Sequence, residues 1–124
     1  MAKIINLTQH NATPDQVTDG VFDPHPNVKH EIRNLLTFDS PPNPSELRAR
    51  AQELAAIAAG HNVSAAMIGG APFFMSALER ALLAVGITPV YAFSKREVIE
   101  EQGPDGQVVK RSVFKHVALV PPAV

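Results

Sequence analysis

The chain has 124 residues, of which 45% are hydrophobic and 19% are charged, and its net charge is −1. This length can bury a core for one domain, and the near-zero charge excludes a broad basic surface for duplex DNA or RNA. The sequence contains no cysteine, which excludes a disulfide framework and a cysteine-ligated metal site.

The first part of the chain alternates short apolar runs with helix-start motifs. Residues 3–8 (KIINLT) are typical of a strand, and TPDQ at residues 13–16 is a capping box that predicts a short helix. Residues 22–27 include two prolines and are expected to form a loop. Apolar spacing from Val28 onward predicts an amphipathic helix that runs into a second strand over residues 35–38.

A second helix-start motif, NPSE at residues 43–46, opens a long helix that Gly60 closes. The segment AAMIGGAPFF at residues 65–74 then combines an apolar run, a double glycine and a proline. This combination predicts a buried strand, a tight turn at Gly69 and Gly70, and a helix from Pro72 to about residue 85. Two glycines can also simply make a tight corner without binding anything.

The last part of the chain reads as a strand and a hairpin. Residues 89–93 (PVYAF) are expected to form a strand that ends at the polar triplet SKR, residues 94–96. GPDG at residues 103–106 is a hairpin-turn signal, and the return strand is expected over residues 108–120.

Strands that alternate with helices predict a parallel α/β sheet. We therefore expect a single three-layer, Rossmann-like α/β domain over residues 1–124, with a mostly parallel sheet and a C-terminal antiparallel β-hairpin. The expected strand order is 2-1-3-4-5. No apolar run reaches the length of a membrane span and the opening segment lacks a secretion signal, so we expect a cytoplasmic protein that binds no membrane.

Open α/β sheets bind ligands beyond the carboxyl ends of their strands. The predicted strands bring backbone amides, hydroxyls, an imidazole and two cations to this edge, which is chemistry suited to a phosphate or phosphodiester. The candidate ligand-binding residues are Asn6, Thr8, Gln9, Gly69, Gly70, Ala71 and Ser94. The candidate catalytic residues are His10 as acid/base and Lys95 and Arg96 as charge stabilisers.

Each of these residues also has a plain structural interpretation. Lys95 and Arg96 could be a solvated charge pair, His10 a turn residue, and His116 a half-buried structural histidine. The five histidines show no metal-binding spacing, so we expect no metal and no cofactor. The P-loop, dinucleotide and nucleophile-elbow motifs are all absent.

The opening NLTQHNATPDQ (residues 6–16), the GGAP turn before an apolar helix and the closing hairpin resemble the CRISPR-associated Rossmann fold. The likeness extends to its small stand-alone, ring-nuclease-type relatives. That resemblance implies a symmetric dimer that binds a cyclic oligoadenylate across its two-fold axis in a phage-defence setting. It also implies, for some members, cleavage without a metal by a ribose 2′-OH aligned on the adjacent phosphate.

The apolar helix over residues 72–85 has few polar positions, and this independently predicts a homodimer. Three classes of function remain open at this point. The protein could be an enzyme that cleaves a small phosphodiester, a non-catalytic sensor of the same anionic nucleotide, or a dimeric interaction protein.

Overall fold

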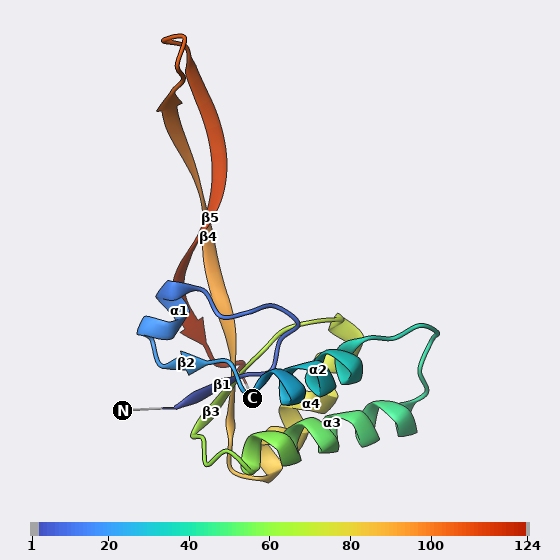
Figure 1. Ribbon diagram of the computed structural model, residues 1–124. Helices are drawn as coiled ribbons and strands as arrows, with labels where there is room; N and C mark the ends of the chain where they lie inside the picture. Colours follow the sequence, from blue (N-terminus) through green and yellow to red (C-terminus); the bar gives the residue numbers. More distant parts are fainter. Residues whose placement is uncertain (1–2, 124) are drawn as a thin grey trace.

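A five-stranded sheet forms the centre of the molecule, with the strand order β2-β1-β3-β4-β5. The computed structural model describes residues 3–123, and the remaining residues of the expected 1–124 domain lie outside the described part (Figure 1). The strands are β1 (Ile4–Asn6), β2 (Val21–Phe22), β3 (Ala65–Ile68), β4 (Thr88–Gln102) and β5 (Val108–Val120). The helices are α1 (Pro14–Thr18), α2 (Pro26–Leu36), α3 (Pro44–Ala59) and α4 (Pro72–Ala84). The first four strands run parallel and β5 is antiparallel to β4, which confirms the predicted fold class and the predicted order of every strand except the second.

The second strand lies in a different segment from the one predicted. Gly20, with φ of 102°, turns the chain out of α1, and β2 then forms at Val21–Phe22, where it overlaps the start of the expected loop. Pro26 starts α2 directly afterwards, and this helix continues to Leu36, where a strand was expected. The apolar residues before Phe38 are therefore the buried stripe of one helix, and the expected strand over residues 35–38 is wrong.

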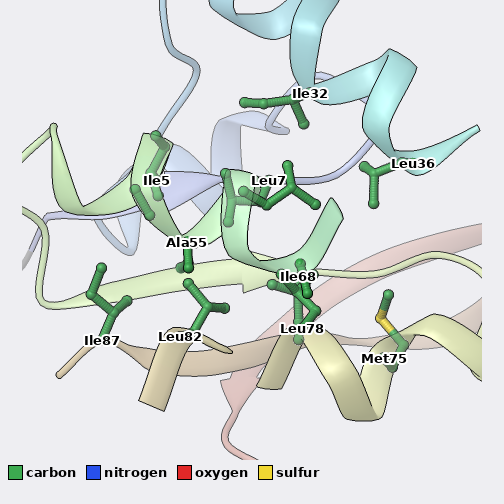
Figure 2. Close-up of a cluster of buried hydrophobic side chains, with 14 of the residues drawn as sticks. Ile5, Leu7, Ile32, Leu36, Ala55, Ile68, Met75, Leu78, Leu82 and Ile87 are labelled. Carbon is green, nitrogen blue, oxygen red and sulfur yellow. The ribbon is translucent and has the colours of Figure 1, made fainter. Parts of the chain in front are cut away.

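The two faces of the sheet carry separate apolar clusters because alternate side chains point to opposite sides. On one face, Ile5, Leu7 and Ile68 pack against α2, α3 and α4, and Figure 2 shows them in one cluster of buried side chains with Ile32 and Leu78. The opposite face carries a smaller cluster, built from Ile4, Val21, Met67 and Val90. In Figure 1, α1 lies apart from the other three helices, near the base of the β4–β5 hairpin. The layers are therefore unequal, with most of the core under the three longer helices.

The helix starts follow the predicted capping chemistry, with one exception. Thr13 and Gln16 form a reciprocal capping box on α1, and the Asn43 side chain accepts a hydrogen bond from the Glu46 amide at the start of α3. The residue before α4 is Ala71, which has no side-chain oxygen and makes no cap. The first turn of α4 thus lacks the side-chain partner that α1 and α3 have.

The β4–β5 hairpin extends far beyond the rest of the sheet (Figure 1). β3 pairs with β4 only from Thr88 to Tyr91, whereas β4 continues to Gln102 through a register shift between Phe93 and Ser94. The expected end of this strand at residue 93 is therefore wrong, because pairing with β5 carries it onward. We call residues 92–118 the arm and the remainder of the described chain the body. Among the described residues, no helix has the length and apolar character needed to cross a membrane.

Candidate functional site

A pocket of about 440 Å³ opens at the carboxyl ends of β1 and β3. It is lined by Thr8, Gln9, His10, Asn11, Thr13, Gln16, Met67, Ile68, Gly69, Gly70, Tyr91 and Ala92. The chain passes from β1 to β2 on one side and from β3 to β4 on the other, so winding reverses between β1 and β3. Ligands of open α/β sheets bind at this kind of position.

Asn6, at the end of β1, shapes the loop that forms one wall of the pocket. Its side chain is fully buried, and its Nδ2 donates to the His10 carbonyl at 2.7 Å and to Asp23 Oδ1 at 2.7 Å. Its Oδ1 accepts from the Thr8 amide at 2.9 Å and from the Thr8 hydroxyl at 2.6 Å. These contacts use the amide group completely, so Asn6 positions the loop and has no donor left for a ligand.

Lys29 of α2 is a second organiser of this loop, and the sequence analysis did not identify it. Its side chain is 4% exposed, and its Nζ donates to the carbonyls of Thr8 and His10, both at 2.9 Å. Asp23 Oδ1 lies 3.7 Å from the ammonium. Burial lowers the pKa of Lys29, and the negative charge of Asp23 partly opposes this. The sequence signal for such a role was the position of Lys29 three residues before Ile32, on the buried stripe of α2.

Arg33 fixes the loop from one turn further along α2. Its Nε donates to the Gln9 carbonyl at 3.1 Å, and its guanidinium also reaches Asn11 Oδ1 at 3.4 Å. The Gln9 side chain in turn donates to the Thr37 hydroxyl at 3.3 Å. The backbone of this loop is thus tied to α2 at several points, which leaves the side chain of His10 exposed at the pocket.

Gly69 and Gly70 form the opposite wall. Gly70 has φ of +152°, a backbone conformation that is strained for any residue with a side chain. A Cβ there would also lie 3.5 Å from Met75 Cε, in contact with the core. Gly69 is unstrained, and a Cβ there would lie 3.7 Å from Thr8 Cγ2, across the pocket. The main chain can approach a ligand closely here, next to the uncapped first turn of α4 at Ala71.

Tyr91 closes the pocket from β4. Its hydroxyl donates to the Glu79 carboxylate on α4, and burial, reinforced by this contact, raises the pKa of Tyr91 well above its ordinary 10.0. The phenol therefore stays neutral at physiological pH. The ring offers the pocket an apolar surface, while the hydroxyl is engaged elsewhere.

The structure brings together five of the predicted site residues and places the others outside the pocket lining. Those that line the pocket are Thr8, Gln9, His10, Gly69 and Gly70. The predicted triplet, residues 94–96, belongs to the arm because β4 does not end there.

The side chain of Arg96 illustrates the effect of this placement. Its guanidinium donates to the Ser112 hydroxyl at 3.3 Å, and Ser112 lies opposite Val98, further toward the hairpin tip. Lys95 lies opposite Lys115 on β5. The geometry thus separates both predicted cations from the pocket.

His116 has the structural role that its strand position indicated. Its Nε2 lies 2.8 Å from Asp19 Oδ2, which connects the base of the arm to the end of α1. Its Nδ1 is buried and has no hydrogen-bond partner among the described residues. No group of three or more metal-ligating side chains occurs within residues 3–123.

Comparison with known proteins places the chain in a family. Neither the curated proteins nor the solved structures contain a significant match to it. A family model described as "Uncharacterized protein MJ1673 family" matches residues 2–120, which is nearly the whole sequence. The chain therefore belongs to the MJ1673 family.

Proposed function

We propose that the pocket binds a small anionic ligand of the nucleotide class. The observation that carries this proposal is the meeting of three features at the switch point of the sheet. These features are the polar loop of residues 8–11, the turn at Gly69 and Gly70, and the uncapped start of α4. At this helix start Pro72 has no N–H and the Phe74 amide donates to the Ala71 carbonyl at 3.0 Å, so the Phe73 amide would meet a phosphate together with the main chain at Gly69 and Gly70.

The lining residues divide the pocket into a polar and an apolar part. Gln9 and Asn11 offer donors and acceptors for ribose or base edges and the Thr8 hydroxyl offers an acceptor, while the ring of Tyr91 offers surface on which a base can lie. The volume of about 440 Å³ lies within the usual range for small-molecule sites. A mononucleotide unit suits this space, and a larger cyclic nucleotide would extend beyond it.

The resemblance to CRISPR-associated Rossmann-fold proteins supplies a specific candidate, a cyclic oligoadenylate in a phage-defence setting. In metal-independent cleavage, the ribose 2′-hydroxyl gives up its proton as its oxygen bonds to the adjacent phosphorus, the bond from phosphorus to the 5′-oxygen breaks, and a second proton reaches the departing 5′-oxygen. His10 is positioned at the pocket to accept the first proton or donate the second. Backbone amides, and not the distant Lys95 and Arg96, would stabilise the phosphate charge.

The test uses a matched pair of glycine variants. Gly69→Ala adds a methyl group inside the pocket at an unstrained position, whereas Gly60→Ala adds one at the end of α3, far from it, where φ is −67°. Calorimetric titration with cyclic oligoadenylates, linear adenylates and inorganic phosphate should show binding by the parent and by Gly60→Ala. Gly69→Ala should fold normally and bind at least about tenfold more weakly, which corresponds to about 1.4 kcal/mol.

Cleavage is assayed separately, with excess chelator present. If the parent cleaves the ligand and His10→Ala binds it without cleaving it, the protein is an enzyme in which His10 takes part. Binding without turnover in the parent indicates a sensor. If none of these anions binds to the parent at millimolar concentration, the proposed function is wrong and the family acts through protein contacts.

A further inference from the structure

The arm leaves both of its long edges without a strand partner. Within the described residues, β4 has no neighbour other than β5 from Ala92 to Gln102, and β5 is the last strand of the sheet. Large apolar side chains on the arm are exposed, including Phe93 at 55%, Val98 at 63% and Phe114 at 77%. An open apolar strand edge is a template for pairing, and a two-stranded ribbon is marginally stable alone in water.

We propose that a second copy of this chain pairs with the free edge of β4, so that two arms form one four-stranded antiparallel sheet. The charges along β4 are segregated. Lys95 and Arg96 lie near the body, while Glu100 and Glu101 lie near the tip, where they also contact Lys110 and Arg111 of the same chain at 4.0 and 2.8 Å. A two-fold axis reverses the direction of the partner strand. It therefore sets the basic half of each β4 opposite the acidic half of the other.

The position of the axis follows from the sequence. A two-fold axis perpendicular to the sheet requires one residue of β4 to lie directly opposite the same residue of the second copy. With Val98 at the axis, Lys95 faces the partner's Glu101 and Arg96 faces the partner's Glu100. Symmetry repeats both pairs, and opposite charges directly across antiparallel strands stabilise the pairing.

Neighbouring registers lack this complementarity. With Glu97 at the axis, two carboxylates face each other, and with Ile99 at the axis, Glu97 faces the partner's Glu101. With Arg96 at the axis, the partner's Gln102 would reach Val90, where β3 already pairs with β4. In the register centred on Val98, the partner strand stops opposite residues 93 and 94, beyond the last β3 pair at Tyr91.

The other free edge is less suited to a closed pair. β5 carries Lys110, Arg111, Lys115 and His116 and no acidic residue, so no register of β5 against its own copy sets opposite charges across from each other. Pairing β4 with the β5 of another copy leaves one edge free at each end and continues without closing. A closed two-fold dimer with complementary charges therefore requires β4 to pair with the β4 of the second copy.

The pairing separates the two bodies. Tyr91 lies seven residue positions before Val98, so each body begins roughly 24 Å from the axis, at opposite ends of the joined arms. Each pocket then belongs to a single chain. The inference does not depend on the proposed ligand, and its test requires none.

The experiment measures the mass of the parent and of two charge-reversed variants by sedimentation. The parent should have twice the chain mass of 13.3 kDa at micromolar concentration. Lys95→Glu with Arg96→Glu, and Glu100→Lys with Glu101→Lys, should each raise the dimer dissociation constant by at least about a hundredfold, because all four charge pairs become repulsive. An equimolar mixture of the two variants should restore the dimer, since every pair is then opposite in charge.

Two controls locate the interface. Lys115→Glu reverses a charge on β5 of the same arm and should leave the dimer intact. Arg80→Glu, on the exposed side of α4, tests the interface that the apolar helix suggested. Circular dichroism checks that each variant is folded, and hydrogen exchange on the parent should show that the amides of residues 94–102 are protected in the dimer.

Several outcomes overturn the inference. A parent that is monomeric at high micromolar concentration excludes it, as does a mixture of the two variants that stays monomeric. Dimers that survive both β4 reversals but dissociate in Arg80→Glu place the interface on α4. Species that grow steadily with concentration indicate open-ended pairing of β4 with β5.

Discussion

The body and the arm share two continuous strands, yet they bury very different fractions of their side chains. In the body, Ile5, Ala66 and Leu78 are fully buried beneath three helices. On the arm, Val98 and Phe114 are 63% and 77% exposed. The same β conformation is therefore stabilised by core packing in one region and by cross-strand pairing in the other. Matched changes in the two regions should separate these contributions.

The largest difference is expected for matched truncations of apolar side chains. Leu78→Ala removes a fully buried side chain of α4 and should lower the free energy of unfolding by about 2–5 kcal/mol. Val98→Ala removes atoms that are already solvated in a single chain and should change it by less than about 0.5 kcal/mol at a protein concentration low enough to keep copies from pairing. Urea denaturation followed by circular dichroism measures both. Equal losses would mean that Val98 is covered by something other than solvent in the sample.

A buried polar contact of the body should come next in size. Lys29→Met keeps the length of the side chain but removes the ammonium donor to the Thr8 carbonyl and one of the donors to the His10 carbonyl, which Asn6 Nδ2 still contacts. Hydrogen bonds to charged groups contribute about 1.5–3 kcal/mol, so we expect a loss in that range. Lys115→Met on the exposed arm is the control and should have almost no effect. A loss as small as the control's would show that water replaces the ammonium in the loop.

The sequence predicted the fold class and strand order because those depend on strong local signals. Pro14, Pro44 and Pro72 mark three of the helix starts, and the GPDG turn marks the hairpin. The second strand was misplaced because β2 has only two residues, too few to show alternation. Its identity depends on pairing with β1, which is a tertiary contact.

The candidate site was predicted only in part, for a related physical reason. The residues of the pocket that were found, such as His10 and Gly69, follow strands whose ends were placed to within about two residues. Lys95 and Arg96 were assigned to the pocket because residue 93 looked like a strand end, whereas pairing with β5 extends β4. Lys29 was missed because a lysine on a helix normally faces solvent, and only the carbonyls of the loop explain its burial.

Tyr91 provides a smaller, pH-dependent test of the contacts that stabilise the body. Because burial raises its pKa above 10.0, the neutral phenol stabilises the body fully below pH 10, and this contribution is lost as the pH rises further. Tyr91→Phe should cost about 0.5–1.5 kcal/mol at neutral pH through the lost hydrogen bond to Glu79. The difference in the free energy of unfolding between the parent and Tyr91→Phe should become smaller above pH 10. Urea denaturation at a series of pH values measures it. A gap that stays constant to about pH 11.5 would mean that the phenol does not titrate differently on folding.

The smallest effect on the body is expected from removing most of the arm. Lys95 and Lys115 face each other across the hairpin, so replacing residues 96–114 by Asn-Gly joins them through a two-residue turn suited to hairpins. The deletion keeps the link between His116 and Asp19 and removes few buried side chains. The free energy of unfolding should therefore change by no more than about 1 kcal/mol. Thermal melting at low protein concentration tests this, because pairing between copies then contributes little. A much lower melting temperature would show that the arm folds as part of the body. An unchanged one, together with loss of the dimer, would show that the arm serves association alone.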